Sequence, residues 1–392
     1  MIYLDNSATS WPKPREVKEA MVRFMDKVGA NPGRSGHLLS LEAARIIYDA
    51  REAIATLFGV RDPSRVIFTL NATEALNLAL KGLLRPGHHV ITSSMEHNSV
   101  MRPLRALEKE GVEIDIIPCS ATGGLDPHEI LLRVRPQTRM IVLTHASNVT
   151  GAILPIREAG FVAREHDLLF LVDAAQTAGA YPIDMERDGI DLLAFTGHKS
   201  LYGPQGTGGL VIGERVPVNE MVPLKQGGTG SRSESEEHPP FLPDRFESGT
   251  PNGVGIAGLH AGVRFVLEKG VQNLRSHEMA LLDKLLTRLK AMRGVICYGP
   301  EDLNRRIATL SFNLEGLTPS EVSFRLEREY GILCRPGLHC APAAHRTLGT
   351  IPQGTVRLSL GAFNTEEEIE TCLRAISAIS ERPSSASIES ES

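Results

Sequence analysis

The sequence has few cysteines, and their spacing excludes two kinds of site. The five cysteines are scattered along 392 residues, at Cys119, Cys297, Cys334, Cys340 and Cys372. An odd, dispersed set in a chain of this length is not the framework of a disulfide-stapled domain, and no CxxC pair offers two zinc ligands. We expect free thiols in a reducing compartment, the cytoplasm, with one of them available for catalysis.

An excess of positive charge and long hydrophobic runs are also absent. Lys and Arg number 42 against 47 Asp and Glu, which gives a net charge of −5 and no basic face for nucleic acid. No early segment combines a charged start with an apolar core, and residues 1–6 already read as structured. We therefore expect no nucleic-acid partner, no export signal and no membrane span.

Short apolar runs alternate with helical patterns from about residue 60 to residue 215. Several runs consist almost entirely of Val, Ile and Leu, which is typical of strands buried on both faces. The alternation predicts an α/β fold with a mostly parallel seven-stranded sheet flanked by helices. The expected strands are Arg65–Leu70, His89–Ser93, Val112–Ile117, Met140–Thr144, Leu168–Asp173, Asp191–Phe195 and Gly209–Ile212. The expected helices include Thr73–Leu84, Ser99–Glu110 and Asp126–Arg133, the last with Asp126 as its N-cap.

The pattern changes after the last of these strands. Residues 225–250 are rich in Gly, Ser, Pro and charge and predict a long loop that is either functional or disordered. Further helices and strands beyond this loop predict a smaller α+β domain. The expected helices are Val254–Leu267, Leu274–Arg293, one from a Thr318 capping box to Gly331, and one that starts at Thr365. The expected strands are Arg306–Leu314 and Val356–Leu360. We expect a large domain over residues 15–255, a small domain formed by 1–14 and 256–381, and a disordered tail over 382–392.

Lys199 and Asp173 are the most informative residues. Lys199 follows the apolar run that ends at Thr196, and a lysine that loses hydration there has the lowered pKa that Schiff-base chemistry needs. Asp173 ends another apolar strand, where a carboxylate suits the pyridinium nitrogen of pyridoxal phosphate. Because ligands of such sheets bind beyond the carboxyl ends of the strands, the two side chains predict a pyridoxal phosphate enzyme.

Five further residues lie near the same edge of the sheet. Ala72 and Thr73 open a helix, whose N-terminal N–H groups either are simply capped or bind the cofactor phosphate. His97 is either a polar rim residue or a ring that stacks on the cofactor and relays protons near neutral pH. Asn148 is either a turn former or a ligand of cofactor or substrate. Gln176 is placed to contact the phenolic oxygen of the cofactor.

The second domain supplies a candidate thiol and a candidate carboxylate clamp. Cys340 stands in a Gly- and Pro-containing loop beside His339 and near Arg335, which predicts an accessible and readily ionised thiol. The other cysteines are interpreted as small core residues. A metal site of His339, Cys340 and His345 lacks a fourth ligand, so we expect no metal. Arg357 interrupts an apolar strand, either as a surface residue or as a clamp for an amino-acid carboxylate.

These residues, in this order, resemble the cysteine desulfurases, which belong to the class V aminotransferase group of fold-type I pyridoxal phosphate enzymes. The resemblance covers about residues 1–375, and its last motif is similar to the second-group, SufS-like desulfurases and selenocysteine lyases. The matching motifs are Leu4-Asp5-Asn6-Ser7-Ala8-Thr9, Asn71-Ala72-Thr73-Glu74, Glu96-His97, Ser147-Asn148, Asp173-Ala174-Ala175-Gln176, Gly197-His198-Lys199, Gly249-Thr250-Pro251 and Arg335-Pro336-Gly337-Leu338-His339-Cys340.

The resemblance implies a role for each matching residue. Lys199 would hold the cofactor covalently, Asp173 would bind its ring nitrogen, Gln176 its phenolic oxygen, and His97 would stack on its ring. The phosphate would be bound by Thr73, Thr196 and His198, with Thr250 reaching in from a second subunit of a homodimer. Asn148, Arg335 and Arg357 would bind the substrate, L-cysteine, and Cys340 would take its sulfur as a persulfide, leaving alanine, before passing the sulfur to an acceptor protein.

Two positions depart from the second-group pattern and leave alternatives open. Typical loops of that group have His where this chain has Leu338, and Thr or Ala where it has Pro336. These differences affect loop mobility, partner docking or the choice between sulfur and selenium. A selenocysteine lyase uses the same cysteine and is not separated by any motif. A class V aminotransferase, epimerase or lyase has no need of Cys340, and a non-catalytic scaffold has no need of Lys199 or Asp173.

Overall fold

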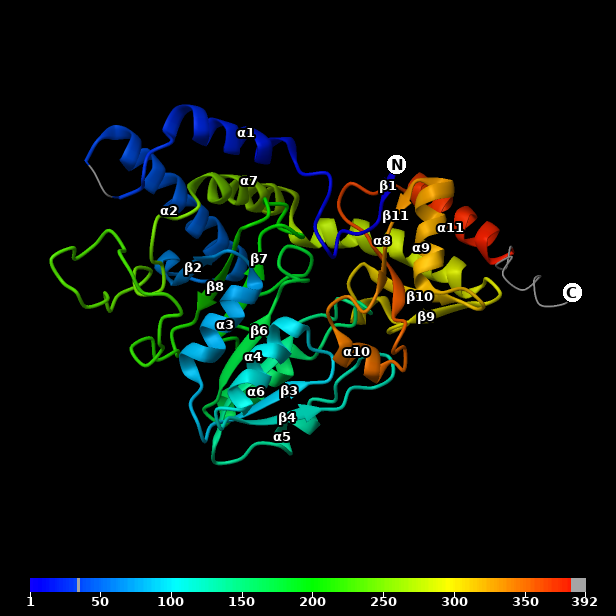
Figure 1. Cartoon of the computed structure of the whole chain (residues 1–392), viewed down its shortest axis with the longest axis horizontal. Helices are drawn as coiled ribbons and strands as arrows, with labels where there is room; N and C mark the ends of the chain where they lie inside the picture. Colours follow the sequence, from blue (N-terminus) through cyan, green and yellow to red (C-terminus); the bar gives the residue numbers. More distant parts are fainter. Residues whose placement is uncertain (34–35, 382–392) are drawn as a thin grey trace, which may run out of the picture.

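A seven-stranded sheet forms the centre of the larger part of the molecule, as the sequence predicts (Figure 1). The computed structural model describes residues 1–33 and 36–381, so the predicted tail 382–392 lies outside the described residues. The strands follow the order β2-β8-β7-β6-β5-β3-β4. Their bounds are β2 Val66–Thr69, β3 His89–Ser93, β4 Glu113–Ile117, β5 Thr138–Thr144, β6 Leu169–Asp173, β7 Leu192–Thr196 and β8 Gly208–Ile212.

The pairing of the strands brings several polar residues to one edge of this sheet. All neighbours are parallel except β8, which runs antiparallel to both β2 and β7. Thr144 at the end of β5 is level with Asp173 on β6, and Asp173 is level with Ala194 on β7. The carboxyl ends of β5, β6 and β7 therefore lie side by side.

Helices cover both faces of the sheet because its strands are apolar on both sides. On β5, Met140 and Val142 pack with α3 and α4, whereas Ile141 and Leu143 pack with α2, α6 and α7. The bounds are α1 Arg15–Arg23, a π-helix Phe24–Val28, α2 Leu38–Phe58, a 3-10 turn Pro63–Arg65, α3 Ala72–Leu83, α4 Asn98–Glu108, α5 His128–Leu131, α6 Ile156–Glu165 and α7 Gly253–Lys269. The helix expected over Asp126–Arg133 is thus shorter, because Asp126 Oδ1 caps only His128 N and the chain turns away after Leu131.

A four-stranded antiparallel sheet of order β12-β13-β10-β9 forms the smaller part. α8, α9 and α11 bury their leucines and isoleucines against it. The bounds are β1 Ile2–Tyr3, α8 Val271–Lys290, β9 Val295–Tyr298, a 3-10 turn Leu303–Arg305, β10 Thr309–Leu314, α9 Pro319–Tyr330, β11 Ile332–Leu333, β12 Arg335–Gly337, α10 Pro342–Thr347, β13 Thr355–Ser359 and α11 Glu366–Ser380. Capping boxes open α9 at Thr318 and α11 at Thr365.

Two segments connect the larger and the smaller part. The expected boundary at residue 255 falls inside α7, which packs on α1 and α2, with Ile256 and Ala257 buried against α2 and the π-helix. The first residues contact both parts, because β1 pairs with β11 while Ser10 bonds to the turn that follows β7. Residues 214–252 form neither helix nor strand. Among the described residues, no helix has the length and apolar character that a membrane crossing requires.

Candidate active site

Lys199 lies at the end of the turn that follows β7. Ser10 fixes this turn, because its backbone N donates to His198 O at 2.9 Å and its Oγ donates to Lys199 O at 2.7 Å. The partly buried Lys199 side chain lines a cavity at the carboxyl edge of the sheet. Burial lowers the pKa of Lys199 to about 8, although the negative charge of Asp173 opposes this shift. The uncharged amine form of Lys199 is therefore populated close to neutral pH.

Asp173 ends β6 on the neighbouring side of the same cavity. Its Oδ1 accepts a hydrogen bond from Ala175 N at 2.9 Å. Burial raises the pKa of Asp173, whereas this hydrogen bond and the charge of Lys199 lower it. A cation placed against the carboxyl group would favour its ionised form, so the site is suited to a positively charged ring nitrogen.

The cavity brings together most of the residues singled out in the sequence. Five segments contribute to it: the start of α3, the start of α4, and the loops after β5, β6 and β7. Its walls contain Ala72, Thr73, His97, Asn148, Asp173, Gln176, Thr196, His198 and Lys199. Thr250, Arg335, Cys340 and Arg357 do not line it.

Three side chains in the cavity have donors to offer an anion. Thr196 Oγ1 and His198 Nδ1 are buried and have no hydrogen-bond partner within the described part of the chain. Thr73 Oγ1 shares a 2.7 Å hydrogen bond with Ser99 Oγ. α3 starts here, and the N–H groups of its first turn have no acceptor inside the helix. Together these groups form an anion-binding end of the cavity.

His97 caps α4 and is neutral. Its Nδ1 accepts from Ser99 N at 3.1 Å, which assigns the ring proton to Nε2. Burial and the charge of Lys199 lower the pKa of His97 to about 4. The ring of His97 therefore stays uncharged near neutral pH in the free chain, and a proton relay through it stays a prediction. His97 thus offers the cavity a flat neutral ring and one N–H donor, Nε2.

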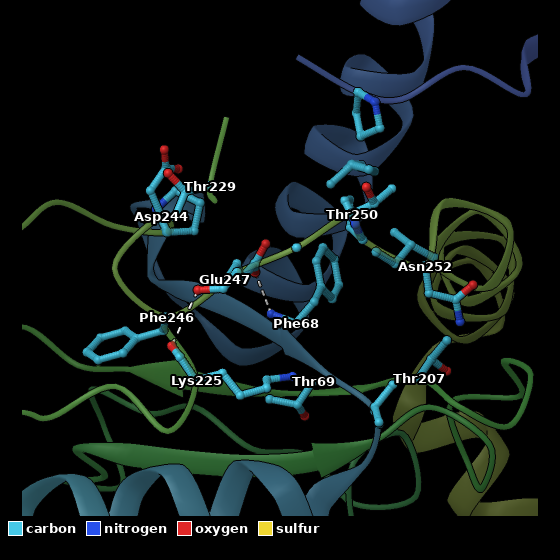
Figure 2. Close-up of a pocket in the computed structure, with 18 of the residues that line it drawn as sticks. Phe68, Thr69, Thr207, Lys225, Thr229, Asp244, Phe246, Glu247, Thr250 and Asn252 are labelled. Atoms are coloured by element: carbon cyan, nitrogen blue, oxygen red, sulfur yellow. Dashed lines mark hydrogen bonds between the residues drawn. The ribbon is translucent and has the colours of Figure 1, made fainter. Parts of the chain in front are cut away.

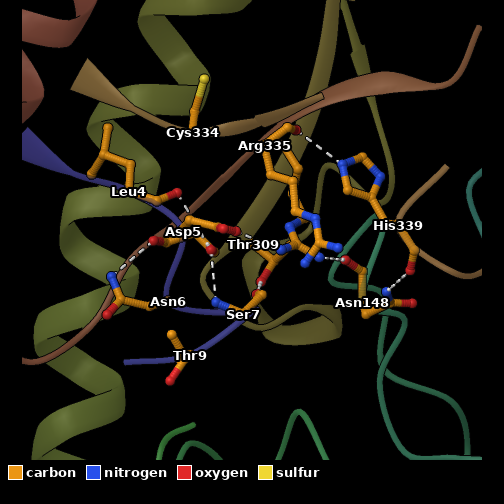
Figure 3. Close-up of polar contacts among 12 residues, drawn as sticks. Leu4, Asp5, Asn6, Ser7, Thr9, Asn148, Thr309, Cys334, Arg335 and His339 are labelled. Carbon is orange, nitrogen blue, oxygen red and sulfur yellow. Dashed lines mark hydrogen bonds and ion pairs between the residues drawn. The ribbon is translucent and has the colours of Figure 1, made fainter. Parts of the chain in front are cut away.

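Arg357 is buried in β13 and already has an acid partner, Asp5, which Figure 3 shows among the polar residues of this region. Its Nη2 lies 2.6 Å from Asp5 Oδ1, with 2% of the Arg357 side chain and 20% of the Asp5 side chain exposed. Its Nη1 donates to Asn148 O at 3.1 Å, and its Nε has no partner among the described residues. The guanidinium is thus held in place, and within the described structure its Nε–H donor is free to bind a further acceptor. Asp5 was not predicted as a partner, because no local pattern links positions so distant in sequence.

Replacing Arg357 by alanine is expected to raise the KM for an amino-acid substrate about 10- to 100-fold, because a charge-assisted hydrogen bond contributes roughly 1.5–3 kcal/mol. Steady-state kinetics measure this effect, with Arg293→Ala as the matched control at an exposed position without an ion pair in the described chain. An unchanged KM in Arg357→Ala would remove Arg357 from the substrate site.

The Cys340 loop follows β12 and is bonded to the wall of the cavity. Cys340 is exposed, and its carbonyl accepts from Asn98 N, next to His97, at 2.9 Å. Asn148 Nδ2 donates to His339 O at 2.7 Å. His339 and Cys340 both adopt the left-handed conformation, with φ of 50° and 56°. Consecutive non-glycine residues in this region are strained, and such strain concentrates at functional sites.

His339 does not supply the positive charge expected beside Cys340. Burial and the charge of Arg357 lower the pKa of His339 to about 3. Its ring lies between Arg335 O, 3.0 Å from Nε2, and His345 Nε2, 3.4 Å from Nδ1. His345 Nδ1 in turn lies 2.7 Å from Thr350 Oγ1. These contacts make the pair of histidines a support for the loop. No group of three or more His, Cys, Asp or Glu side chains is arranged to hold a metal ion in the described ranges.

Thr250 lies away from Lys199, in the segment between β8 and α7. It is exposed and lines a separate cavity, together with Phe68, Lys225 and Glu247 (Figure 2). Glu247 fixes one wall of that cavity, since it pairs with Arg51 at 2.5 Å and accepts from Phe68 N at 2.6 Å. Within one chain, Thr250 therefore does not join the other candidate cofactor ligands.

Glu96 is a fully buried carboxyl group that the sequence showed only as a neighbour of His97. Ser93 Oγ donates to its Oε1 at 2.5 Å, and Thr144 N lies 3.0 Å and 2.9 Å from its two oxygens. Glu96 thus joins the ends of β3 and β5. Burial raises the pKa of Glu96 to about 8, and the nearby Asp173 contributes to this rise.

Glu96→Gln is expected to flatten the dependence of stability on pH between pH 5 and pH 8. A carboxyl group with a raised pKa binds more protons in the folded chain than in the unfolded one, so folding weakens as pH rises toward that pKa. The slope from one such group approaches about 1.4 kcal/mol per pH unit. Thermal unfolding of both proteins across this range measures it. Parallel curves would contradict the assignment of Glu96 as the titrating group.

The family model described as aminotransferase class-V matches residues 2–372. A protein of Methanothermobacter thermautotrophicus described as a probable cysteine desulfurase is 35% identical over 94% of this chain and 92% of its own. A cysteine desulfurase of Yersinia pestis is 32% identical over 97% of this chain and 93% of its own.

The fold is also similar to solved structures of proteins with this description. The apo structure of the cysteine desulfurase of Thermococcus onnurineus superimposes with a TM-score of 0.91, at 33% identity over 97% of this chain and 94% of the other. The chain therefore belongs to the class-V aminotransferase family and, within it, to the cysteine desulfurases.

Proposed function

We propose that this protein is a pyridoxal phosphate-dependent cysteine desulfurase that converts L-cysteine to L-alanine and collects the sulfur as a persulfide on Cys340. The observation that carries the proposal is the combination of two sites. Lys199 and Asp173 face one cavity, and an exposed cysteine loop is bonded to the wall of that cavity through Asn148, whose Nδ2 donates to His339 O at 2.7 Å. The descriptions of the relatives support the same activity.

The residues present fit pyridoxal phosphate. The unpartnered Thr196 Oγ1 and His198 Nδ1, with Thr73 and the start of α3, offer donors to a phosphate. Lys199 offers an amine, and Asp173 offers a buried carboxyl group whose ionised form a cation would stabilise. When bound, the cofactor supplies an electron sink for the bonds at the substrate α-carbon.

The residues of the chain perform the remaining steps. Lys199 Nζ, whose pKa of about 8 lies near neutral pH, takes a proton and returns it. Asp173 would hold its negative charge against the ring nitrogen of the cofactor. His97, uncharged, offers its flat face and its Nε2–H. Gln176, whose Nε2 also donates to Ser7 O at 3.2 Å, presents its carboxamide to the same space.

Substrate binding and sulfur removal are assigned to the small sheet. Arg357 and Arg335 are cross-strand neighbours on β13 and β12, and with Asn148 they would bind the α-carboxylate. Cys340 Sγ, as thiolate, attacks the substrate sulfur. A sulfur–sulfur bond forms as the carbon–sulfur bond breaks, the electron pair stays with carbon, and a proton completes the methyl group of alanine.

The position of Thr250 supports a homodimer with a shared site. Thr250 is exposed and lies outside its own chain's Lys199 cavity, so in this proposal it contacts the cofactor phosphate of the partner subunit. All five cysteines are free, which favours a reducing compartment such as the cytoplasm. An acceptor protein would take the sulfur from the exposed Cys340.

Purified protein loaded with pyridoxal phosphate tests the proposal when it receives L-cysteine or L-selenocysteine together with dithiothreitol. Alanine and sulfide from L-cysteine support a desulfurase. Alanine from L-selenocysteine alone would make it a selenocysteine lyase, the alternative that uses the same thiol. Amino-group transfer to a keto acid, without alanine and sulfide from cysteine, would indicate an aminotransferase.

A further inference from the structure

An open groove lies between α4 and α10, beside the Cys340 loop. We call it the α4–α10 groove; its charged walls are Arg102, Arg105, Lys109 and Arg346, and its apolar floor includes Met101 and Ile116. It is separate from the Lys199 cavity, with which it shares no residue. None of the residues used above for cofactor or substrate lines it.

Among the described residues, the groove is lined by four positive charges and by no carboxylate, on a chain whose net charge is −5. Arg105 is paired with Glu108 at 2.6 Å. Arg102, Lys109 and Arg346 are exposed and form no ion pair anywhere in the described part of the chain. Uncompensated charges of one sign beside a concave surface attract a partner of the opposite sign and orient it.

The floor of the groove favours a polypeptide over a nucleic acid. Met101, Ile116, Pro342 and Ala343 provide apolar contacts, and in the described part of the chain no aromatic side chain lines the groove for the stacking of bases. An acidic segment with apolar side chains matches both the walls and the floor.

The groove and the thiol are rigidly connected. Asn98, which lines the groove, donates from its backbone N to Cys340 O at 2.9 Å. α10 begins at Pro342, two residues after the thiol, and Thr347 Oγ1 donates to Ser94 Oγ at 2.9 Å across the end of the groove. A segment seated in the groove would therefore lie next to Cys340.

We propose that the α4–α10 groove docks an acidic, partly apolar segment of the protein that accepts sulfur from Cys340. This proposal rests on the proposed desulfurase function and names the chemistry of its partner. In the transfer, the acceptor thiolate attacks the outer sulfur of the persulfide. The new sulfur–sulfur bond forms as the bond to Cys340 Sγ breaks, and Cys340 leaves as a thiolate.

A synthetic peptide that has one cysteine among Asp, Glu and Leu residues serves as the probe, and its twin has Asn and Gln in place of the acids. The double variant Lys109→Glu/Arg346→Glu replaces two of the four positive charges by negative ones and so brings the charge of the lining residues to zero. Lys269→Glu/Arg293→Glu changes the net charge equally at exposed positions outside the groove. Fluorescence anisotropy with a serine-for-cysteine form of each peptide gives binding constants, and alanine release from L-cysteine gives turnover with each thiol peptide.

We expect the acidic peptide to bind wild-type protein and the control variant, more tightly at low salt, and the groove variant at least about tenfold more weakly. The neutral twin should bind none of them. Dithiothreitol should support equal rates of alanine release in all three proteins. With wild-type protein, the acidic thiol peptide should support faster alanine release than its neutral twin, and this difference in rate should disappear in the groove variant.

Equal binding of the acidic peptide by wild-type protein and the groove variant would overturn the proposal. Preference for a single-stranded RNA over the acidic peptide would overturn it as well, in favour of a nucleic-acid partner. The failure of the desulfurase function is a separate result: no alanine would appear with dithiothreitol, while the binding data would still test the groove.

Discussion

Lys199→Ala is expected to abolish turnover, with a fall in alanine release of about a thousandfold or more, since proton transfer by a positioned group alone contributes roughly 10²- to 10⁴-fold. Lys199 is the one amine among the residues that line the cavity in the described chain. Its loss removes both the proton carrier and the group that attaches the cofactor. Alanine release from L-cysteine measures the first effect, and cofactor retained on the denatured protein after borohydride reduction measures the second.

Lys13→Ala is the matched control for this prediction. Lys13 Nζ donates to His198 O at 2.8 Å, so it supports the same turn from outside the cavity, and burial lowers its pKa to about 8 as it does that of Lys199. The control should keep cofactor attachment. Normal turnover in Lys199→Ala, or attachment lost only in Lys13→Ala, would remove Lys199 from its role.

Cys340→Ser is expected to keep the cofactor bound but to form no persulfide, and alanine release should fall at least about a hundredfold, equivalent to about 2.7 kcal/mol of barrier. Cys340 does not line the Lys199 cavity, so the substitution leaves the candidate cofactor ligands intact. Mass spectrometry of the protein after one turnover, together with the cofactor absorbance, separates the two effects.

Cys334→Ser provides the control at a neighbouring thiol of the same segment. Burial raises the pKa of Cys334 to about 11, so its thiol is a poor nucleophile. The control should retain persulfide formation on Cys340. If Cys340→Ser still released alanine at the wild-type rate, another group would be the sulfur acceptor.

Local patterns in the sequence predicted much of the fold. The apolar runs that end at Ser93, Thr144 and Asp173 coincide with strands β3, β5 and β6, because strands buried on both faces must be apolar throughout. The alternation of these runs with helices also predicted that Asp173 and Lys199 share the carboxyl edge of one sheet. The Thr318 capping box and Gly331 mark the bounds of α9 because both act within one turn of helix.

Contacts between distant segments were not predictable in this way. Asp5 pairs with Arg357 across the two ends of the chain, and Ser10 supports Lys199 from far upstream in sequence. The neutral state of His97 and His339 follows from burial, which depends on the whole fold. The left-handed backbone conformation of Cys340 could not be predicted from its residue type, because glycine is the residue that usually adopts this conformation.

The most direct test of the account is the state of Cys340 after a single turnover. Wild-type protein with bound pyridoxal phosphate is mixed with an equal amount of L-cysteine without reductant, and the peptide that contains Cys340 is then analysed by mass spectrometry. The account predicts one added sulfur atom on Cys340 and one alanine for each persulfide formed. Alanine without sulfur on Cys340, or sulfur on another cysteine, would contradict it.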